Sequence, residues 1–252
     1  MYYQSRGVIL KSRDFKDSDK LLSIFTEKDG KVKAIAKGVK KPKSSLRSCV
    51  QPFCHSFLYL NRGREMDLIT QGRLLDFYGN SRQDLERALH CLYLMELLDK
   101  SLLEHVPLPG LYHTLINVLK AINEQELNPL YIRYFETQLL VHLGYQPVLR
   151  HCVKCGQQLD KKIFFDLAEG GLTCLSCSRE NEYQMVFSGE TLGLLRFMTE
   201  GNLQAVNRIK ASPAGLKQLE LFLEKYLEYH LDRRFKTKNT ISLMKKNMVF
   251  PN

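Results

Sequence analysis

The sequence predicts an α+β protein of several domains, in which a small five-stranded barrel precedes a helical domain that carries a four-cysteine insert. Three observations support this prediction. Short strand patterns separated by turn residues fill the first 80 residues, apolar residues then recur at helical spacing, and two Cys-x-x-Cys pairs interrupt the helical part. We therefore expect a barrel at 1–80, a helical domain at 81–148 and 179–235, a cysteine insert at 149–178 and a basic tail at 236–252.

The first 80 residues contain five segments of strand character and no helical pattern. Charged and apolar residues alternate in Lys31–Lys37, as in a half-exposed strand. Asp29-Gly30 predicts a two-residue hairpin turn before this segment. Five short strands with a basic face are typical of the oligonucleotide-binding Greek-key barrel, the OB fold. The expected strands are Ser5–Phe15, Lys20–Thr26, Lys31–Lys37, Val50–Leu60 and Met66–Leu75.

Positive charge is concentrated in this expected barrel. The chain has a formal net charge of +10, and residues 1–80 hold 16 lysine and arginine residues against eight acidic ones. Such a bias within one domain favours a polyanion as a partner. A basic surface that is merely solvated is the alternative, and composition alone leaves both interpretations open.

The segment Lys37–Ser48 holds five basic residues and no acid. Gly38, Pro42 and the serines predict a flexible loop rather than a strand. A cationic loop suits a phosphate backbone, because each contact releases condensed counterions and adds affinity without sequence preference. A mobile, solvated loop is the alternative. The barrel also has aromatic residues that can stack on bases, although most are expected in the core: Phe15, Phe53, Phe57 and Tyr59.

Helical spacing begins near residue 80. A helix capped by Asn80 or Ser81 is expected to continue to about Leu103, and the residues 89–98 are apolar nearly all round, which predicts a deeply buried helix. Val106–Pro109 ends this pattern. The expected buried face consists of Leu85, Leu89, Leu92 and Met95 or Glu96.

Four more helices have recognisable ends. A second helix is expected at about 110–123, and a third begins after Asn128 and ends at Gly144. Ser188 caps a fourth helix, and Ser212-Pro213 begins a fifth. Two short strands around a turn are expected between the cysteine pairs, at Lys162–Leu167 and Gly170–Leu172.

The cysteine pairs have the spacing of a four-thiolate zinc site, with 18 residues between them. Each two-residue gap lets the chain bend back so that both sulfurs reach one ion, and Gly156 eases the turn behind the first pair. Four thiolates leave no coordination position for water, which favours a structural zinc over a catalytic one. The expected ligands are Cys152, Cys155, Cys174 and Cys177.

Two disulfides or a redox dithiol are the alternatives for these cysteines. The chain begins without the apolar segment of a signal peptide, which favours a cytoplasmic protein with reduced thiols. A thioredoxin-type pair needs a βαβ pattern and no second pair. His151 is a substitute ligand that four thiolates make unnecessary. The other cysteines are expected in the core: Cys49, Cys54 and Cys91.

Neither a membrane span nor an enzyme is expected. No run approaches 18 consecutive apolar residues. Nucleotide-binding, nucleophile-elbow and zinc-protease motifs are missing, and the seven histidines are scattered. The basic tail is either a second polyanion contact or only a solvated segment, and its sequence does not distinguish the two. Its basic residues are Arg233, Arg234, Lys236, Lys238, Lys245 and Lys246.

The order of these features resembles the bacterial recombination mediator family RecO over essentially the whole chain. The resemblance rests on Gly7–Leu22, Ala36–Ser44, Gln51–Phe53, Leu143–Tyr145 and the cysteine insert. It implies a structural zinc on the four insert cysteines, although some members of the family lack them. It also implies DNA contacts at the positions that match the basic loop and its adjoining strand: Lys33, Lys37, Lys40, Lys41, Lys43 and Arg47.

The function implied by the resemblance is non-enzymatic DNA repair in the cytoplasm, at the bacterial nucleoid, in the recombinational RecFOR-type pathway. Similar proteins bind single- and double-stranded DNA and anneal complementary strands. They contact the acidic C-terminal tail of the single-stranded-DNA-binding protein and, with RecR, help to load RecA. An RNA-binding factor with the same barrel and zinc ribbon is the alternative, since fold does not fix function. A zinc-dependent hydrolase is a further alternative that would need an open metal position.

Overall fold

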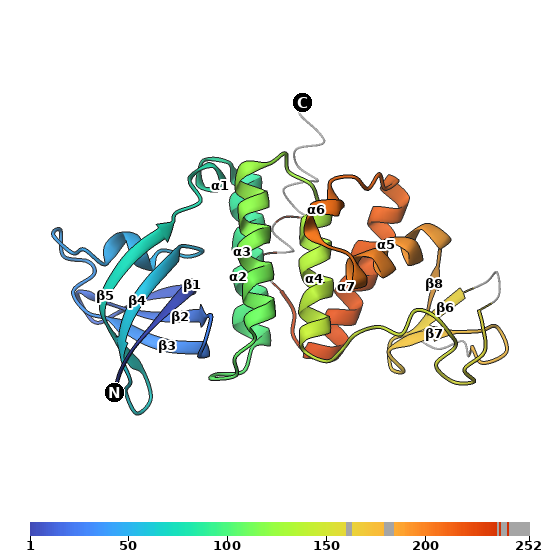
Figure 1. Cartoon of the computed structure of the whole chain (residues 1–252), viewed down its shortest axis with the longest axis horizontal. Helices are drawn as coiled ribbons and strands as arrows, with labels where there is room; N and C mark the ends of the chain where they lie inside the picture. Colours follow the sequence, from blue (N-terminus) through green and yellow to red (C-terminus); the bar gives the residue numbers. More distant parts are fainter. Residues whose placement is uncertain (160–162, 179–183, 236, 238–240, 242–252) are drawn as a thin grey trace. The chain divides into compact units, whose positions relative to one another are not determined.

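The computed structural model describes residues 1–159, 163–178, 184–235, 237 and 241 (Figure 1). The chain divides into two compact units. One comprises Met1–Leu127 with the described residues after Arg234, and the other is Asn128–Arg234. This division passes through the segment 81–148 that we expected to belong to one helical domain. The domain boundaries expected from the sequence stay a prediction.

The first unit contains a closed five-stranded barrel with the strand order β1-β2-β3-β5-β4. Strand β1 pairs antiparallel with both β2 and β4, and β3 pairs in parallel with β5. This Greek-key closure is the topology of the OB fold, and it confirms the expected barrel. The strands are β1 (Tyr2–Phe15), β2 (Asp19–Thr26), β3 (Gly30–Ala36), β4 (His55–Asn61) and β5 (Asp67–Asp76).

Two local expectations for the barrel were wrong. Glu27–Asp29 forms a turn, and Gly30 opens β3 with a φ of 68°, so Asp29-Gly30 is not a two-residue hairpin loop. The fourth strand begins at His55 instead of Val50, because Arg47–Val50 forms a 3₁₀ helix (η1). The buried residues of η1 are Cys49 and Val50. Val50 therefore belongs to a helical turn and not to the start of a strand.

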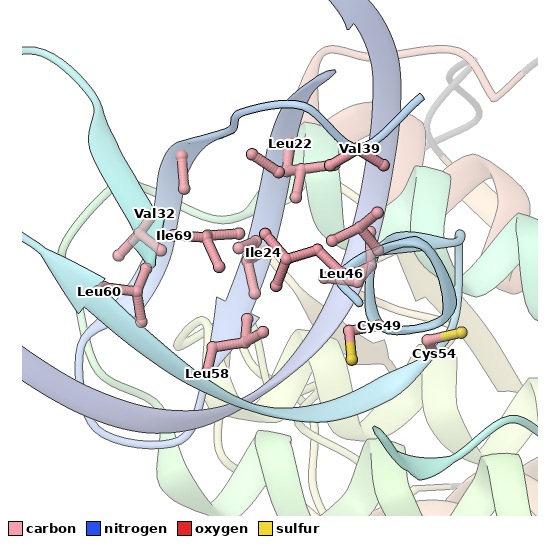
Figure 2. Packing of buried hydrophobic residues seen from close by; sticks show 14 residues of the cluster. Leu22, Ile24, Val32, Val39, Leu46, Cys49, Cys54, Leu58, Leu60 and Ile69 are labelled. Carbon is pink, nitrogen blue, oxygen red and sulfur yellow. The ribbon is translucent and has the colours of Figure 1, made fainter. Parts of the chain in front are cut away.

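The barrel core includes residues from the basic loop. Inward residues of the strands, among them Ile24, Val32 and Leu58, meet Val39 and Leu46 of the loop (Figure 2). Burying an aliphatic side chain of this size contributes roughly 1.5–3 kcal/mol. The burial of Val39 and Leu46 therefore stabilises the position of the loop against the barrel. The cysteines expected in the core are buried: Cys49, Cys54 and Cys91.

The expected helix from residue 80 is two helices, α1 (Gly79–Gln83) and α2 (Leu85–Ser101). Asp84 separates them with an extended backbone, and its carboxylate accepts a hydrogen bond from the Arg87 N–H at 2.8 Å. The expected buried face was wrong, since Leu85 is 60% exposed and Leu92 is 36% exposed. Helix α3 (Pro109–Glu124) lies beside α2 (Figure 1).

The second unit contains the remaining described helices, and the helix starts expected at Ser188 and Ser212 are confirmed. The helix expected after Asn128 begins at Leu130 with Pro129 as its N-cap, and the short helix Leu203–Val206 was not predicted. The side chains of Asn128, Ser188 and Ser212 each accept a hydrogen bond from a backbone N–H of the first turn. Among the helices that the structure describes, none combines the length and apolar character needed to cross a bilayer. These helices are α4 (Leu130–His142), α5 (Gly189–Glu200), α6 (Leu203–Val206) and α7 (Pro213–Leu231).

A small three-stranded sheet forms the cysteine insert, with the order β7-β6-β8. Phe165 of β6 packs on Phe222 and Tyr226 of α7, with ring centroids 4.7 and 5.3 Å apart. The insert is thus fixed to α7 by an aromatic cluster. The expected start at Lys162 lies outside the described residues, and the third strand was not predicted. The strands are β6 (Ile163–Asp166), β7 (Gly171–Thr173) and β8 (Gln184–Phe187).

Candidate metal centre and nucleic-acid interface

The four insert cysteines converge on one point. Cys152 and Cys155 lie between α4 and β6, and Cys174 and Cys177 follow β7. Their sulfur atoms all lie within 4.8 Å of one another, and the Cys155 and Cys174 sulfurs are 3.8 Å apart. A tetrahedral ion with metal–sulfur bonds of about 2.3 Å places its sulfurs at about this separation. The cysteines are unpaired, so the disulfide alternative does not describe this structure.

Backbone hydrogen bonds shape both cysteine turns. The Gly156 N–H donates to the Cys152 carbonyl at 2.8 Å, and Gly156 has a left-handed φ of 73°, which agrees with the turn expected behind the first pair. The Cys177 N–H donates to the Cys174 carbonyl at 3.1 Å. These bonds close one tight turn in each cysteine pair.

Electrostatics favour thiolates at two of the four positions. Burial raises the pKa of the Cys152 thiol, but backbone N–H groups that donate to its sulfur lower the pKa to about 6. The Ser176 hydroxyl, 3.1 Å from the Cys174 sulfur, lowers the pKa of Cys174. The pKa of Cys177 is raised because its thiol interacts with Cys174. A bound cation is what would allow all four thiols to deprotonate together.

An ion pair joins the first cysteine turn to the sheet. The Lys154 ammonium lies 3.1 Å from the Asp166 carboxylate of β6, which is 2% exposed. The same carboxylate accepts a hydrogen bond from the Ala168 N–H.

His151 is exposed and does not belong to the sulfur cluster. The described residues therefore form a four-cysteine cluster that can bind a metal ion.

All six candidate DNA contacts are exposed. Lys33 lies on β3, the four lysines from Lys37 to Lys43 lie on the loop that follows, and Arg47 is the first residue of η1. The Gly38 N–H donates to the Asp19 carboxylate at 2.8 Å, and this bond lowers the pKa of Asp19. The Arg47 guanidinium donates to the carbonyls of Lys40 and Lys41 at 2.8 and 3.1 Å. These bonds and the buried side chains of Val39 and Leu46 attach the loop to the barrel.

The lysines of this group differ in their surroundings. Lys33 pairs with Glu104 at 2.6 Å, and Lys40 pairs with Asp14 at 2.8 Å. In the part of the chain that the structure describes, the other three make no ion pair: Lys37, Lys41 and Lys43. The ammonium groups of these three lysines can therefore bind a phosphate without first breaking an ion pair with a carboxylate.

A basic surface on the strands extends beyond the predicted contact Lys33. Lys11 pairs in register with Ser23, and Ser23 pairs with Lys33, so these residues form one row across β1, β2 and β3. Together with Arg13 and Lys31 the two lysines line a hollow of about 230 Å³. The alternation of charged and apolar residues in each strand predicts that these cations face outward. It does not predict that strand pairing places them side by side.

The four barrel aromatics have different environments. Phe53 is buried under the Arg82 guanidinium, whose central carbon is 3.9 Å from the ring centroid. Phe57 and Tyr59 meet edge to face at 5.4 Å, and Tyr59 is 41% exposed. Tyr59 is therefore the aromatic residue of this group that offers the most ring surface to a base, while Phe15 and Phe57 are half-buried.

These features define a class of protein: an OB-fold barrel with a cationic strand face, followed by helices that carry a four-cysteine cluster able to bind a metal ion. Comparison with known proteins identifies one family within this class. Residues 1–78 match the family model described as "Recombination protein O N terminal", and residues 82–239 match "Recombination protein O C terminal".

Individual relatives agree with the family models. The chain is 52% identical to the DNA repair protein RecO of Syntrophomonas wolfei, over 98% of this chain and 99% of the relative. It is 34% identical to that of Desulforamulus reducens, over 93% and 92% of the two chains. It is 37% identical to that of Clostridium perfringens, over 82% and 83%. The chain belongs to the RecO family of DNA repair proteins.

Proposed function

We propose that this chain is a non-catalytic DNA-binding mediator of recombinational repair, which anneals complementary strands. The observation that carries the proposal is the exposed loop, where Lys37, Lys41 and Lys43 have no ion-pair partner among the described residues. Two DNA strands repel each other through their phosphates. A cationic surface that binds both lowers this repulsion and lets the bases pair.

The proposed contact surface combines the loop with the β1–β3 face. The loop supplies Lys37, Lys41 and Lys43 directly. Lys33 and Lys40 would exchange a carboxylate for a phosphate, which costs little because exposed ion pairs are weak. Arg47 acts mainly by holding the loop carbonyls. Phosphate contacts of this kind give affinity for single and double strands without a sequence preference.

Membership of the family supports the partners in this proposal. They are RecR, the single-stranded-DNA-binding protein, bound through its acidic C-terminal tail, and RecA, which the complex helps to load.

We propose zinc as the ion at the cysteine cluster, with a structural role. Cys152, Cys155, Cys174 and Cys177 supply four thiolates, and soft sulfur ligands in a tetrahedral set suit this ion. When bound, the ion would join the two cysteine turns, while Lys154 and Asp166 hold the first turn against the sheet.

An annealing assay tests the proposed function. We expect the Lys37→Gln/Lys41→Gln/Lys43→Gln variant to anneal two labelled complementary strands about tenfold more slowly than the unmodified chain, because three phosphate contacts are lost. The matched control removes three exposed lysines of the second unit and should anneal normally: Lys210→Gln/Lys217→Gln/Lys225→Gln. Equal rates for both variants would contradict the assigned surface. A competing RNA strand of the same sequence tests the RNA-binding alternative.

A further inference from the structure

The connection between α2 and α3 is attached to the start of β3. Glu104 forms an isolated parallel bridge with Lys31, and the His105 N–H donates to the Lys31 carbonyl at 2.9 Å. Gly30 has a φ of 68°, and a Cβ there would lie 2.3 Å from the Val106 carbonyl oxygen. The connection therefore has a fixed register along the strand.

This attachment places acidic groups against the cations of the β1–β3 face. The Glu104 carboxylate lies 2.6 Å from the Lys33 ammonium, and the Asp99 carboxylate lies 3.7 Å from that of Lys11. The Lys31 ammonium donates to the backbone carbonyl of Asp99 at 2.7 Å. Since Asp99 is in the last turn of α2, this carbonyl belongs to the negative end of the helix dipole.

Both carboxylate pairs are accessible to solvent. The side chains of Lys11 and Lys33 are 50% and 52% exposed, and those of Asp99 and Glu104 are 23% and 38% exposed. An ion pair this open is screened by water and can be exchanged, so each one changes a binding constant by about fivefold at most. A phosphate that approaches the face must therefore compete with a carboxylate for the same ammonium.

We propose that Asp99 and Glu104 are internal competitors that regulate the β1–β3 face. They occupy Lys11 and Lys33 in the free protein and lower the affinity of this face for polyanions. A strand with closely spaced phosphates displaces them, whereas an isolated anion does not. This inference rests on the proposed function, because it concerns the same DNA-binding surface.

Fluorescence anisotropy of a labelled single strand, measured over a salt series, tests the inference. The Asp99→Asn/Glu104→Gln variant should bind about 5- to 25-fold more tightly than the unmodified chain, since two ion pairs no longer compete. The slope of log K against log salt should stay nearly the same, because the bound strand displaces both carboxylates in the unmodified chain and the same phosphates are then neutralised in both proteins. Adding Lys11→Gln and Lys33→Gln to this variant should abolish the gain.

A matched control has the same change of net charge. Glu86 and Glu126 are exposed acids of the first unit that make no ion pair within the described residues, and Glu86→Gln/Glu126→Gln should bind within about twofold of the unmodified chain. Equal binding by the Asp99/Glu104 variant and the unmodified chain, or an equal gain in the control, would overturn the inference alone. If no variant binds the strand even at low salt, the proposed function fails with it.

Discussion

Arg47 has a different role from the lysines beside it. Its guanidinium donates to the backbone carbonyls of Lys40 and Lys41. The side chain of Lys40 is itself paired with Asp14. Lys41 extends from the same turn without an ion-pair partner among the described residues. Adjacent cations can therefore either maintain the loop or offer their charge to a ligand, depending on which acceptors lie within reach.

The cysteine cluster leads to a prediction at the scale of one residue. Cys174→Ser should lose the metal ion and lower the melting temperature by about 5 °C or more, which for a chain of this size corresponds to roughly 2 kcal/mol. Single-strand affinity per folded molecule should not change, because the basic loop belongs to the other compact unit. Metal analysis, calorimetry and anisotropy measure the three quantities.

His151→Ala is the control for this experiment. The imidazole is next to Cys152 in the chain but is exposed and outside the sulfur cluster, so its removal should leave metal content and melting temperature unchanged. A Cys174→Ser protein that keeps its full stability without metal would contradict the structural role of the ion.

The junction between α1 and α2 gives a prediction at the scale of an element. Asp84 caps α2 through its bond to the Arg87 N–H. Asp84→Ala should therefore lower the free energy of unfolding by about 1 kcal/mol, which denaturant titration can measure. Asp84→Asn keeps an oxygen acceptor and should lose much less. If alanine and asparagine destabilise the protein equally, the cap is not the cause.

The strength of local signals decided which elements could be predicted. Ser188 and Ser212 identify helix starts because each cap depends only on its own first turn. The buried side of α2 depends on packing against other elements, so an apolar run on several faces did not reveal that Leu85 and Leu92 are exposed. Strands β6 and β7 could be predicted because they flank a turn between the cysteine pairs, whereas β8 follows the second pair and has no such turn signal.

The candidate sites follow the same rule. Two cysteine pairs and one basic loop are contiguous in the chain, so their residue types and spacing could be recognised directly. The partners of the lysines could not, because Asp14 and Glu104 come close to Lys40 and Lys33 only after the barrel has folded and the connection after α2 has paired with β3.

For the whole molecule, charge and metal chemistry belong to different compact units. The OB barrel carries the basic loop in the first unit, and the cysteine cluster lies in the second. Each unit has elements that hold its own candidate site in place: Val39 and Leu46 for the loop, and Phe165 against α7 for the insert. Loss of one site should therefore leave the other intact. The basic residues of the tail at 236, 238, 245 and 246 lie outside the described residues.

The most direct test of the central claim is the salt dependence of single-strand binding. We would measure fluorescence anisotropy for the unmodified chain, for Lys37→Gln/Lys41→Gln/Lys43→Gln, and for the control that lacks the three lysines of the second unit. Loss of three phosphate contacts should reduce the slope of log K against log salt by about 2, while the control keeps the full slope. An unchanged slope in the loop variant would contradict the claim that this loop binds the DNA backbone.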